Sequence, residues 1–192
     1  GDAFGLGVFK STNGGASWVQ ITSGMDANMT IAELAMHPSD PNIILAATST
    51  GLYRTTNGGA SWSKRLTGTL WKDVKFKPGD PTISYATYSG SLYTSANTGN
   101  TWSLITLPVT GAIRIAIAVT PDNPDYVYLV LTKSDKTFSA LLRSVNSGVD
   151  FTVMSTSPNI FDYECDGSET SGQGFYDLCI AANTTNDNTI HV

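Results

Sequence analysis

Two aspartates, Asp26 and Asp73, have the residue type and the spacing that catalysis by a pair of carboxylates would need. They occupy comparable positions in adjacent repeats of the chain. Two carboxylates held roughly 6.5–9.5 Å apart hydrolyse a glycosidic bond with inversion. The alternative is that both are solvated loop acids or bond to nearby backbone, and we favour this interpretation. The sequence therefore leans away from an enzyme, with Asp26 and Asp73 as its catalytic candidates.

Four further residues are candidates for ligand binding: Trp71, Lys72, Arg114 and Asn28. Trp71 opens a predicted strand, where an aromatic ring either packs into the core or stacks on a sugar. Lys72 and Arg114 stand at or near the start of predicted inner strands, and Asn28 lies in a connecting loop. We expect these four side chains to gather on the face that the connecting loops build.

An acidic stretch, Asp162, Glu164 and Asp166 followed by glycine, imitates the opening of a calcium loop. Gln173 stands where the closing glutamate of such a loop belongs. A solvated acidic loop is therefore the favoured interpretation, and calcium is the one metal that the sequence suggests. No cofactor is predicted.

The two cysteines are Cys165 and Cys179. A metal-binding or catalytic pair is disfavoured, because no metal-ligand spacing surrounds them. Two unrelated buried thiols are a second alternative. We predict a disulfide, which would stabilise the fold by about 3 kcal/mol in an oxidising compartment.

A short motif occurs four times along the chain and defines the repeats in which these residues lie. Its skeleton is Ser/Thr-x-Asn-x-Gly-x-(Ser/Thr/Asp)-aromatic, called the Asn box below. The repeated positions are Asn13, Gly15 and Trp18; Asn57, Gly59 and Trp62; Asn97, Gly99 and Trp102; and Asn146, Gly148 and Phe151. Asparagine closes turns with its side chain, and glycine accepts a positive φ. Each copy predicts a strand, a tight turn and a second strand, with the aromatic ring packed over the turn.

Between the boxes lie pairs of apolar stretches joined by a turn rich in proline and aspartate. One such pair and one box make a four-stranded unit of about 40 to 50 residues, the period of a propeller blade. The predicted fold is all-β, a β-propeller of four-stranded antiparallel blades with about four blades' worth present. Expected bounds are a half blade at 1–29, blades at about 30–66, 71–105 and 112–156, and a half blade at 172–192, all in one segment.

The halves either close a four-bladed ring or belong to a larger propeller. The inner strands of the predicted blades are almost continuously apolar, which favours the larger propeller. The Asn box resembles the Asp-box or BNR repeat of sialidases, xyloglucanase-type hydrolases and sortilin-like domains, with Asn in place of Asp. The run from 7 to 192 also resembles the N-terminal part of large secreted BNR-repeat proteins that carry a type IX secretion sorting domain. This resemblance implies a propeller whose boxes lie away from any active site.

Sialidase chemistry is excluded by the arginines, because only Arg114 starts an inner strand and three must converge. Charged residues make up only 14% of the chain, and the net charge is −5. That balance disfavours nucleic acid and anionic membranes as partners, and no apolar run is long enough to cross a bilayer. We expect a secreted or cell-surface module that binds glycan or protein, or has a structural role beside further blades or domains. Part of a xyloglucanase-like hydrolase is the alternative.

Overall fold

The computed structural model describes residues 5–164 and 166–192, which form only strands, turns and loops. The strands are β1 (Phe9–Lys10), β2 (Val19–Gln20), β3 (Ile31–Met36), β4 (Ile44–Thr48), β5 (Gly51–Thr55), β6 (Ser63–Thr67), β7 (Trp71–Phe76), β8 (Ser84–Tyr88), β9 (Ser91–Ser95), β10 (Ser103–Ile105), β11 (Arg114–Val119), β12 (Val127–Thr132), β13 (Phe138–Ser144), β14 (Thr152–Ser155), β15 (Ala181–Ala182) and β16 (Ile190–His191). No helix in this described part has the length and apolar character needed to cross a membrane.

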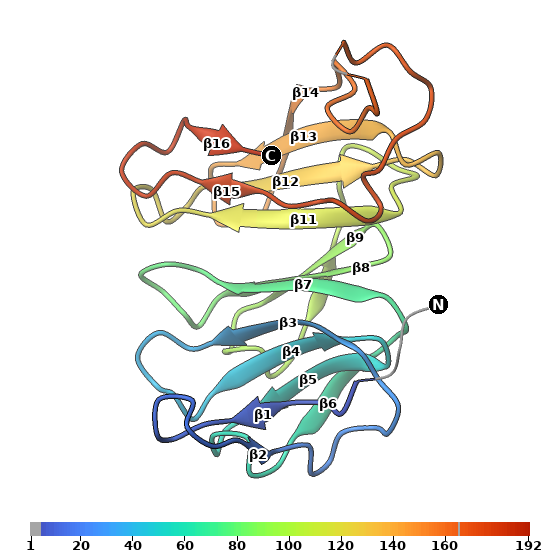
Figure 1. Cartoon of the computed structure of the whole chain (residues 1–192). Helices are drawn as coiled ribbons and strands as arrows, with labels where there is room; N and C mark the ends of the chain where they lie inside the picture. Colours follow the sequence, from blue (N-terminus) through green and yellow to red (C-terminus); the bar gives the residue numbers. More distant parts are fainter. Residues whose placement is uncertain (1–4, 165) are drawn as a thin grey trace.

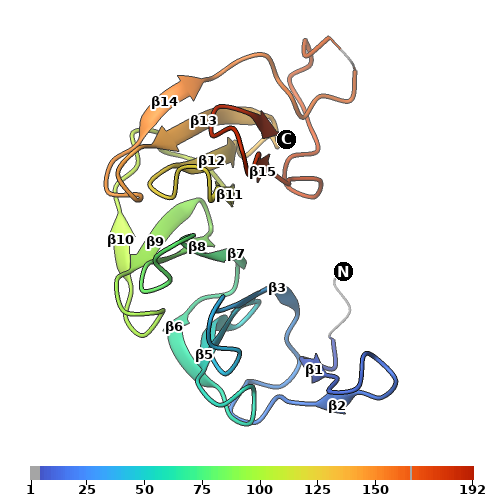
Figure 2. The same ribbon diagram turned by 90° about the vertical axis from the view of Figure 1, so that its left-hand side faces the viewer.

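Three four-stranded antiparallel sheets follow each other along the chain: β3 to β6, β7 to β10, and β11 to β14. The two-stranded sheets β1–β2 and β15–β16 stand at the two ends. Figure 1 shows the sheets stacked beside one another, and Figure 2 shows that together they follow an open arc. Among the described residues, β1 pairs only with β2 and β16 only with β15, so these end strands do not seal a ring.

The first strand of each four-stranded sheet lies on the concave side of the arc (Figure 2). β3 packs beside β7, and β7 beside β11. The apolar cores lie between successive sheets rather than within one sheet. One core joins Leu45 and Leu52 to Val74, and the next joins Tyr85 and Leu92 to the apolar faces of β11 to β13. Each sheet is therefore stabilised mainly by the burial of its faces against its neighbours.

The four Asn boxes form the same turn. In each, the asparagine Oδ1 accepts the backbone N–H four residues later, at 2.8–3.0 Å. The Ser or Thr hydroxyl two residues earlier accepts the N–H of the box glycine, at 2.8–3.1 Å. All four box glycines have a positive φ. At Gly59, Gly99 and Gly148 a Cβ would approach a side chain of the preceding sheet within 2.3–2.8 Å, so these turns also join adjacent sheets.

The aromatic residues that end the boxes are not equally buried. Trp62 is buried and donates its indole N–H to the Ile21 carbonyl of the preceding hairpin at 2.7 Å. Trp18 is 61% exposed. The Trp18 ring does lie over its own turn, with its Cζ2 3.8 Å from where a Cβ on Gly15 would be, but no neighbouring sheet among the described residues buries it. Burial of this ring depends on the sheet beside it, because Trp62 gains its contacts from the β1–β2 hairpin.

Candidate functional site on the concave edge

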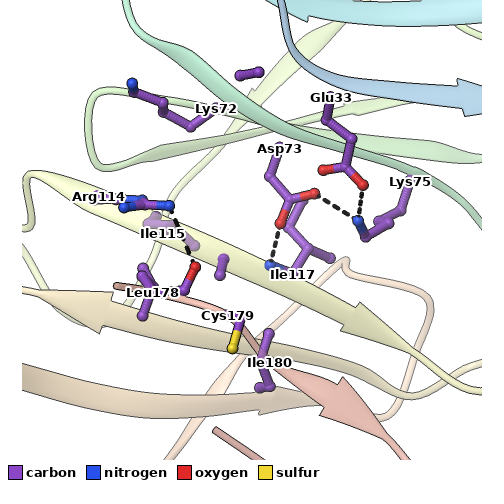
Figure 3. A pocket seen from close by; sticks show the side chains of 12 residues that line it. Glu33, Lys72, Asp73, Lys75, Arg114, Ile115, Ile117, Leu178, Cys179 and Ile180 are labelled. Atoms are coloured by element: carbon purple, nitrogen blue, oxygen red, sulfur yellow. Dashed lines mark hydrogen bonds and ion pairs between the residues drawn. The ribbon is translucent and has the colours of Figure 1, made fainter. Parts of the chain in front are cut away.

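Three inner strands and the segment before β15 enclose a pocket of about 230 Å³ on the concave edge of the arc (Figure 3). Glu33 comes from β3, Lys72, Asp73 and Lys75 come from β7, and Arg114 opens β11. Residues 178–180, with Cys179 among them, close the remaining side. The pocket thus draws charged side chains from three successive sheets.

A β-bulge precedes each of the two acids. The register of β3 with β4 shifts between Ile31 and Glu33, and that of β7 with β8 shifts between Trp71 and Asp73. β11 pairs with β12 without such a shift. A bulge bends its strand and re-aims the side chains that follow it. Glu33 and Asp73 therefore occupy equivalent places in their sheets, turned toward the next sheet.

Both acids accept a hydrogen bond from the backbone of that next sheet. Asp73 Oδ2 accepts the N–H of Ile117 at 2.7 Å, and Glu33 Oε2 accepts the N–H of Val74 at 3.4 Å. The inner strand of each sheet is an edge strand, so such N–H groups have no partner within their own sheet. The two carboxylates therefore connect successive sheets along the concave edge.

Lys75 lies between the two carboxylates. Its Nζ pairs with Glu33 and lies 3.1 Å from Asp73 Oδ1. Asp73 Oδ1 is buried, and its contact with the Lys75 ammonium is an ion pair; no further donor among the described residues reaches it. Asp73 as a whole is only 8% exposed. The ion pair with Lys75 compensates part of the cost of burying this carboxylate.

Burial and the nearby Asp73 raise the pKa of Glu33 to about 7, although Lys75 opposes the shift. Burial disfavours the charge on Lys75, but Asp73 and Glu33 outweigh this effect and raise its pKa. Burial lowers the pKa of Arg114. At neutral pH the pocket thus combines an acid close to its titration point, Glu33, with three cationic side chains, Lys72, Lys75 and Arg114.

Arg114 ties the pocket to the segment before β15. Its guanidinium donates to the carbonyl oxygens of Phe175 and, at 3.3 Å, Leu178. Leu178 is buried beside Phe138 and Phe161 in a separate apolar cluster. Arg114 therefore fixes the wall of the pocket that residues 175–178 form.

The raised pKa of Glu33 predicts a stability that falls as pH rises from about 5 to 8. The unfolded chain releases this proton near pH 4.5 and the folded chain near pH 7, so the folded state binds more protons in between. We expect Glu33→Gln to flatten this dependence, measured as urea midpoints at pH 5, 6, 7 and 8. The variant keeps both histidines, so their contribution cancels in the comparison. Equal slopes for the two proteins would contradict the prediction.

Sequence reasoning placed three of the pocket residues on the ligand face: Lys72, Asp73 and Arg114, which the structure brings into this pocket. Asp26 and Asn28 line a different pocket of about 310 Å³, beside the loop before β3. Asp26 there pairs with Lys64 at 2.5 Å, and this hydrogen bond lowers its pKa. The expectation that Asp26 and Asp73 form one catalytic pair is wrong, because Asp26 precedes its inner strand whereas Asp73 lies within one.

Trp71 is not available to a ligand. It is only 2% exposed, and its ring centroid lies 5.1 Å from that of Tyr88 and 5.2 Å from that of Tyr93. Its indole N–H donates to the Thr67 carbonyl at 3.3 Å. The suggested role in sugar stacking is therefore wrong, because the ring faces the gap between two sheets and fills it.

The acidic stretch does not gather into a metal site within the described residues. Asp162 accepts backbone N–H groups from Glu164 and Glu169, and Asp166 accepts that of Ser168. The suggested calcium ligands are thus engaged in turns of their own loop. Cys165 lies outside the described residues, so its disulfide with the exposed Cys179 stays a prediction.

Glu33 and Lys75 were missed by sequence reasoning, although a signal for Glu33 exists. Glu33 stands five residues before Pro38, and Asp73 stands five before Pro78. The same position before Pro121 holds Ala116. Aligning the repeats on these turn prolines would have paired the two acids.

No protein-family model matches this chain, and no curated protein matches it. Solved structures do match. An ancestral GH74 enzyme aligns with 76% of this chain and 21% of its own, with a TM-score of 0.65 and 25% identity. The GH74 xyloglucanase from Xanthomonas campestris aligns with 82% of this chain and 25% of its own, with a TM-score of 0.56 and 20% identity. YCF48 bound to D1 peptide aligns with 76% and 46%, with a TM-score of 0.54 and 19% identity.

The fold is a partial β-propeller. The predicted all-β class of four-stranded antiparallel blades is confirmed, and each four-stranded sheet is one blade. The chain spans less than half of each of these three structures. The pocket therefore lies where the inner strands of neighbouring blades meet, on the side that faces the propeller axis.

Proposed function

We propose that this chain is part of a secreted β-propeller that binds neutral glycans in the pocket between β3, β7 and β11. The observation that carries the proposal is Asp73 in the pocket lining: among the described residues its buried Oδ1 has the Lys75 ammonium as an ion-pair partner and no further donor. A sugar hydroxyl is a donor small enough to share this oxygen with Lys75. A site built to bond a hydroxyl also rejects ligands that lack one.

Donors for sugar oxygens lie beside this acceptor. Arg114 uses some of its five N–H groups on two carbonyls, which leaves others for a ligand. Lys72 also lines the pocket. Lys75 is paired with Glu33 and Asp73, which leaves Lys72 and Arg114 as donors to a ligand. The net charge of −5 over the whole chain favours a neutral ligand over a polyanion.

Composition supports an extracellular location for this propeller. The surface is polar without being strongly ionic, since only 14% of residues are charged. The Asn boxes support membership of the secreted BNR-repeat class, of the type that carries a type IX sorting domain. Further blades or domains of a parent chain would then cover the two end hairpins.

A glycoside hydrolase is the second candidate, because the ancestral GH74 structure reaches 25% identity. Glu33, with a pKa of about 7, then has the acidity that a general acid needs. Against this, Asp73 and Glu33 both hold backbone N–H groups of the next blade and share Lys75. Release of new reducing ends from xyloglucan would favour the hydrolase.

The test of binding is native gel electrophoresis through gels that contain xyloglucan or, for comparison, polygalacturonate. We expect xyloglucan alone to retard the chain. Asp73→Asn replaces this acceptor by a donor of equal size and should weaken binding about tenfold or more, since it leaves polar groups mismatched. Asp40→Asn, in the turn after β3, is the matched control and should bind like the unaltered chain.

Circular dichroism establishes that Asp73→Asn keeps the β-sheet fold. Should it unfold, Lys72→Ala takes its place, because among the described residues Lys72 makes no hydrogen bond or ion pair to another blade. Equal binding by the folded pocket variant and the unaltered chain would contradict this site. Stronger retardation by polygalacturonate would contradict the neutral ligand class.

A further inference from the structure

The long segment between β14 and β15 presents two aromatic rings beside the pocket. Tyr176 is 69% exposed, and its ring packs edge-on against Phe175, with centroids 5.3 Å apart. Lys72, which lines the pocket, lies over the Phe175 ring at 6.0 Å. Lys136 lies over the Tyr176 ring at 5.2 Å. Lys72 thus links the pocket to the Phe175 ring.

The backbone that carries these rings is firmly held. Gly174 donates to the Lys136 carbonyl at 3.0 Å, and the N–H groups of Tyr176 and Asp177 donate to Gln173 at 2.8 and 3.1 Å. Arg114 binds the Phe175 carbonyl from the pocket side. A Cβ at Gly174 would lie 2.5 Å from Thr132, so the segment packs tightly against β12.

An exposed ring on a well-anchored backbone is a pre-ordered contact surface. Tyr176 is largely exposed, so its burial contributes little to the stability of the fold. Because its backbone is already ordered, binding a ligand there would cost little conformational entropy. Flat aromatic faces with polar groups at their rim suit the C–H faces and hydroxyls of sugar rings. Trp71 has no such face free, because Tyr88 and Tyr93 cover it.

We infer that Phe175 and Tyr176 form a second sugar subsite, on which a neutral polysaccharide stacks next to the residue held in the Asp73 pocket. This inference rests on the proposed glycan binding and names the part of the site that accepts a chain rather than a single sugar. The occupant is neutral because the chain as a whole carries a net charge of −5 and Asp177 lies next to Tyr176. Lys72 and Lys136 frame the rings as donors to hydroxyl groups.

The test is xyloglucan binding by the full chain, measured for Tyr176→Ala, Tyr176→Phe and Trp18→Ala. Tyr176→Ala should lose about tenfold in affinity, and Tyr176→Phe should keep most of it because the ring remains. Trp18→Ala removes a ring of similar exposure on a box turn and should bind like the unaltered chain. Thermal unfolding of Tyr176→Ala should match that of the unaltered chain.

The outcomes separate this inference from the proposed function. Binding by Tyr176→Ala equal to that of the unaltered chain overturns the subsite alone, while Asp73→Asn still reports on the pocket. Equal losses in Tyr176→Ala and Trp18→Ala also overturn it, because they would show nonspecific adhesion to aromatic rings. No binding by the unaltered chain overturns the proposed function and the subsite together.

Discussion

Replacement of Trp71 by alanine should destabilise the protein by about 3–5 kcal/mol, the range found when a large buried aromatic side chain is removed. The ring is almost wholly buried between Tyr88, Tyr93 and the neighbouring blade. The substitution also removes the indole N–H that donates to the Thr67 carbonyl, which leaves that acceptor short of a donor. Urea unfolding followed by circular dichroism measures the change without relying on tryptophan fluorescence.

Trp18→Ala is the matched control, because it removes the same side chain from an exposed position. We expect a change within about 0.5 kcal/mol, as is usual for surface substitutions. A loss below about 1 kcal/mol in Trp71→Ala would show that Trp71 is not a core residue. In that case its role on the ligand face would have to be considered again.

Replacement of Gly90 by alanine should cost roughly 3 kcal/mol or more, since two separate mechanisms combine. Gly90 has φ +76° in the turn between β8 and β9, where a side chain is strained. Its Cβ would also lie 1.9 Å from the carbonyl oxygen of Ala112, which is backbone leading into β11. The second and third blades would have to move apart to admit the methyl group.

Gly111→Ala separates these two mechanisms. Gly111 has φ +78° but open space around its would-be Cβ, so only the backbone strain remains. We expect a cost of about 1 to 2 kcal/mol for it. Similar unfolding midpoints for the two variants would refute the close approach of the blades at Gly90.

The blade architecture was predictable because its signals are local. An Asn box closes its own turn within eight residues, through bonds between Asn57, its neighbouring hydroxyls and the Gly59 N–H. Alternation and turn residues then define the strands on either side. Residue types at regular spacing thus determine the hairpins and the four strands of each repeat without any contribution from tertiary contacts.

The pocket was only partly predictable because its contacts are not local. Asp73 binds Ile117, 44 residues away, and Glu33 binds Val74, 41 residues away. Lys72 and Arg114 were identifiable as residues at the start of inner strands. Lys75, which lies between Glu33 and Asp73, has no sequence signal that separates it from a solvated lysine.

Sequence by itself determined the repeat, the turn chemistry and the all-β class, since each depends on residues within a few positions of one another. Tertiary structure decided which acids meet. A bulge before Glu33 and another before Asp73 turn both carboxylates toward the next blade, whereas Asp26 stays in a loop with Lys64. Tertiary structure also decided that Trp71 lies in the core and Tyr176 on the surface, because the burial of a ring depends on what the neighbouring blade places against it.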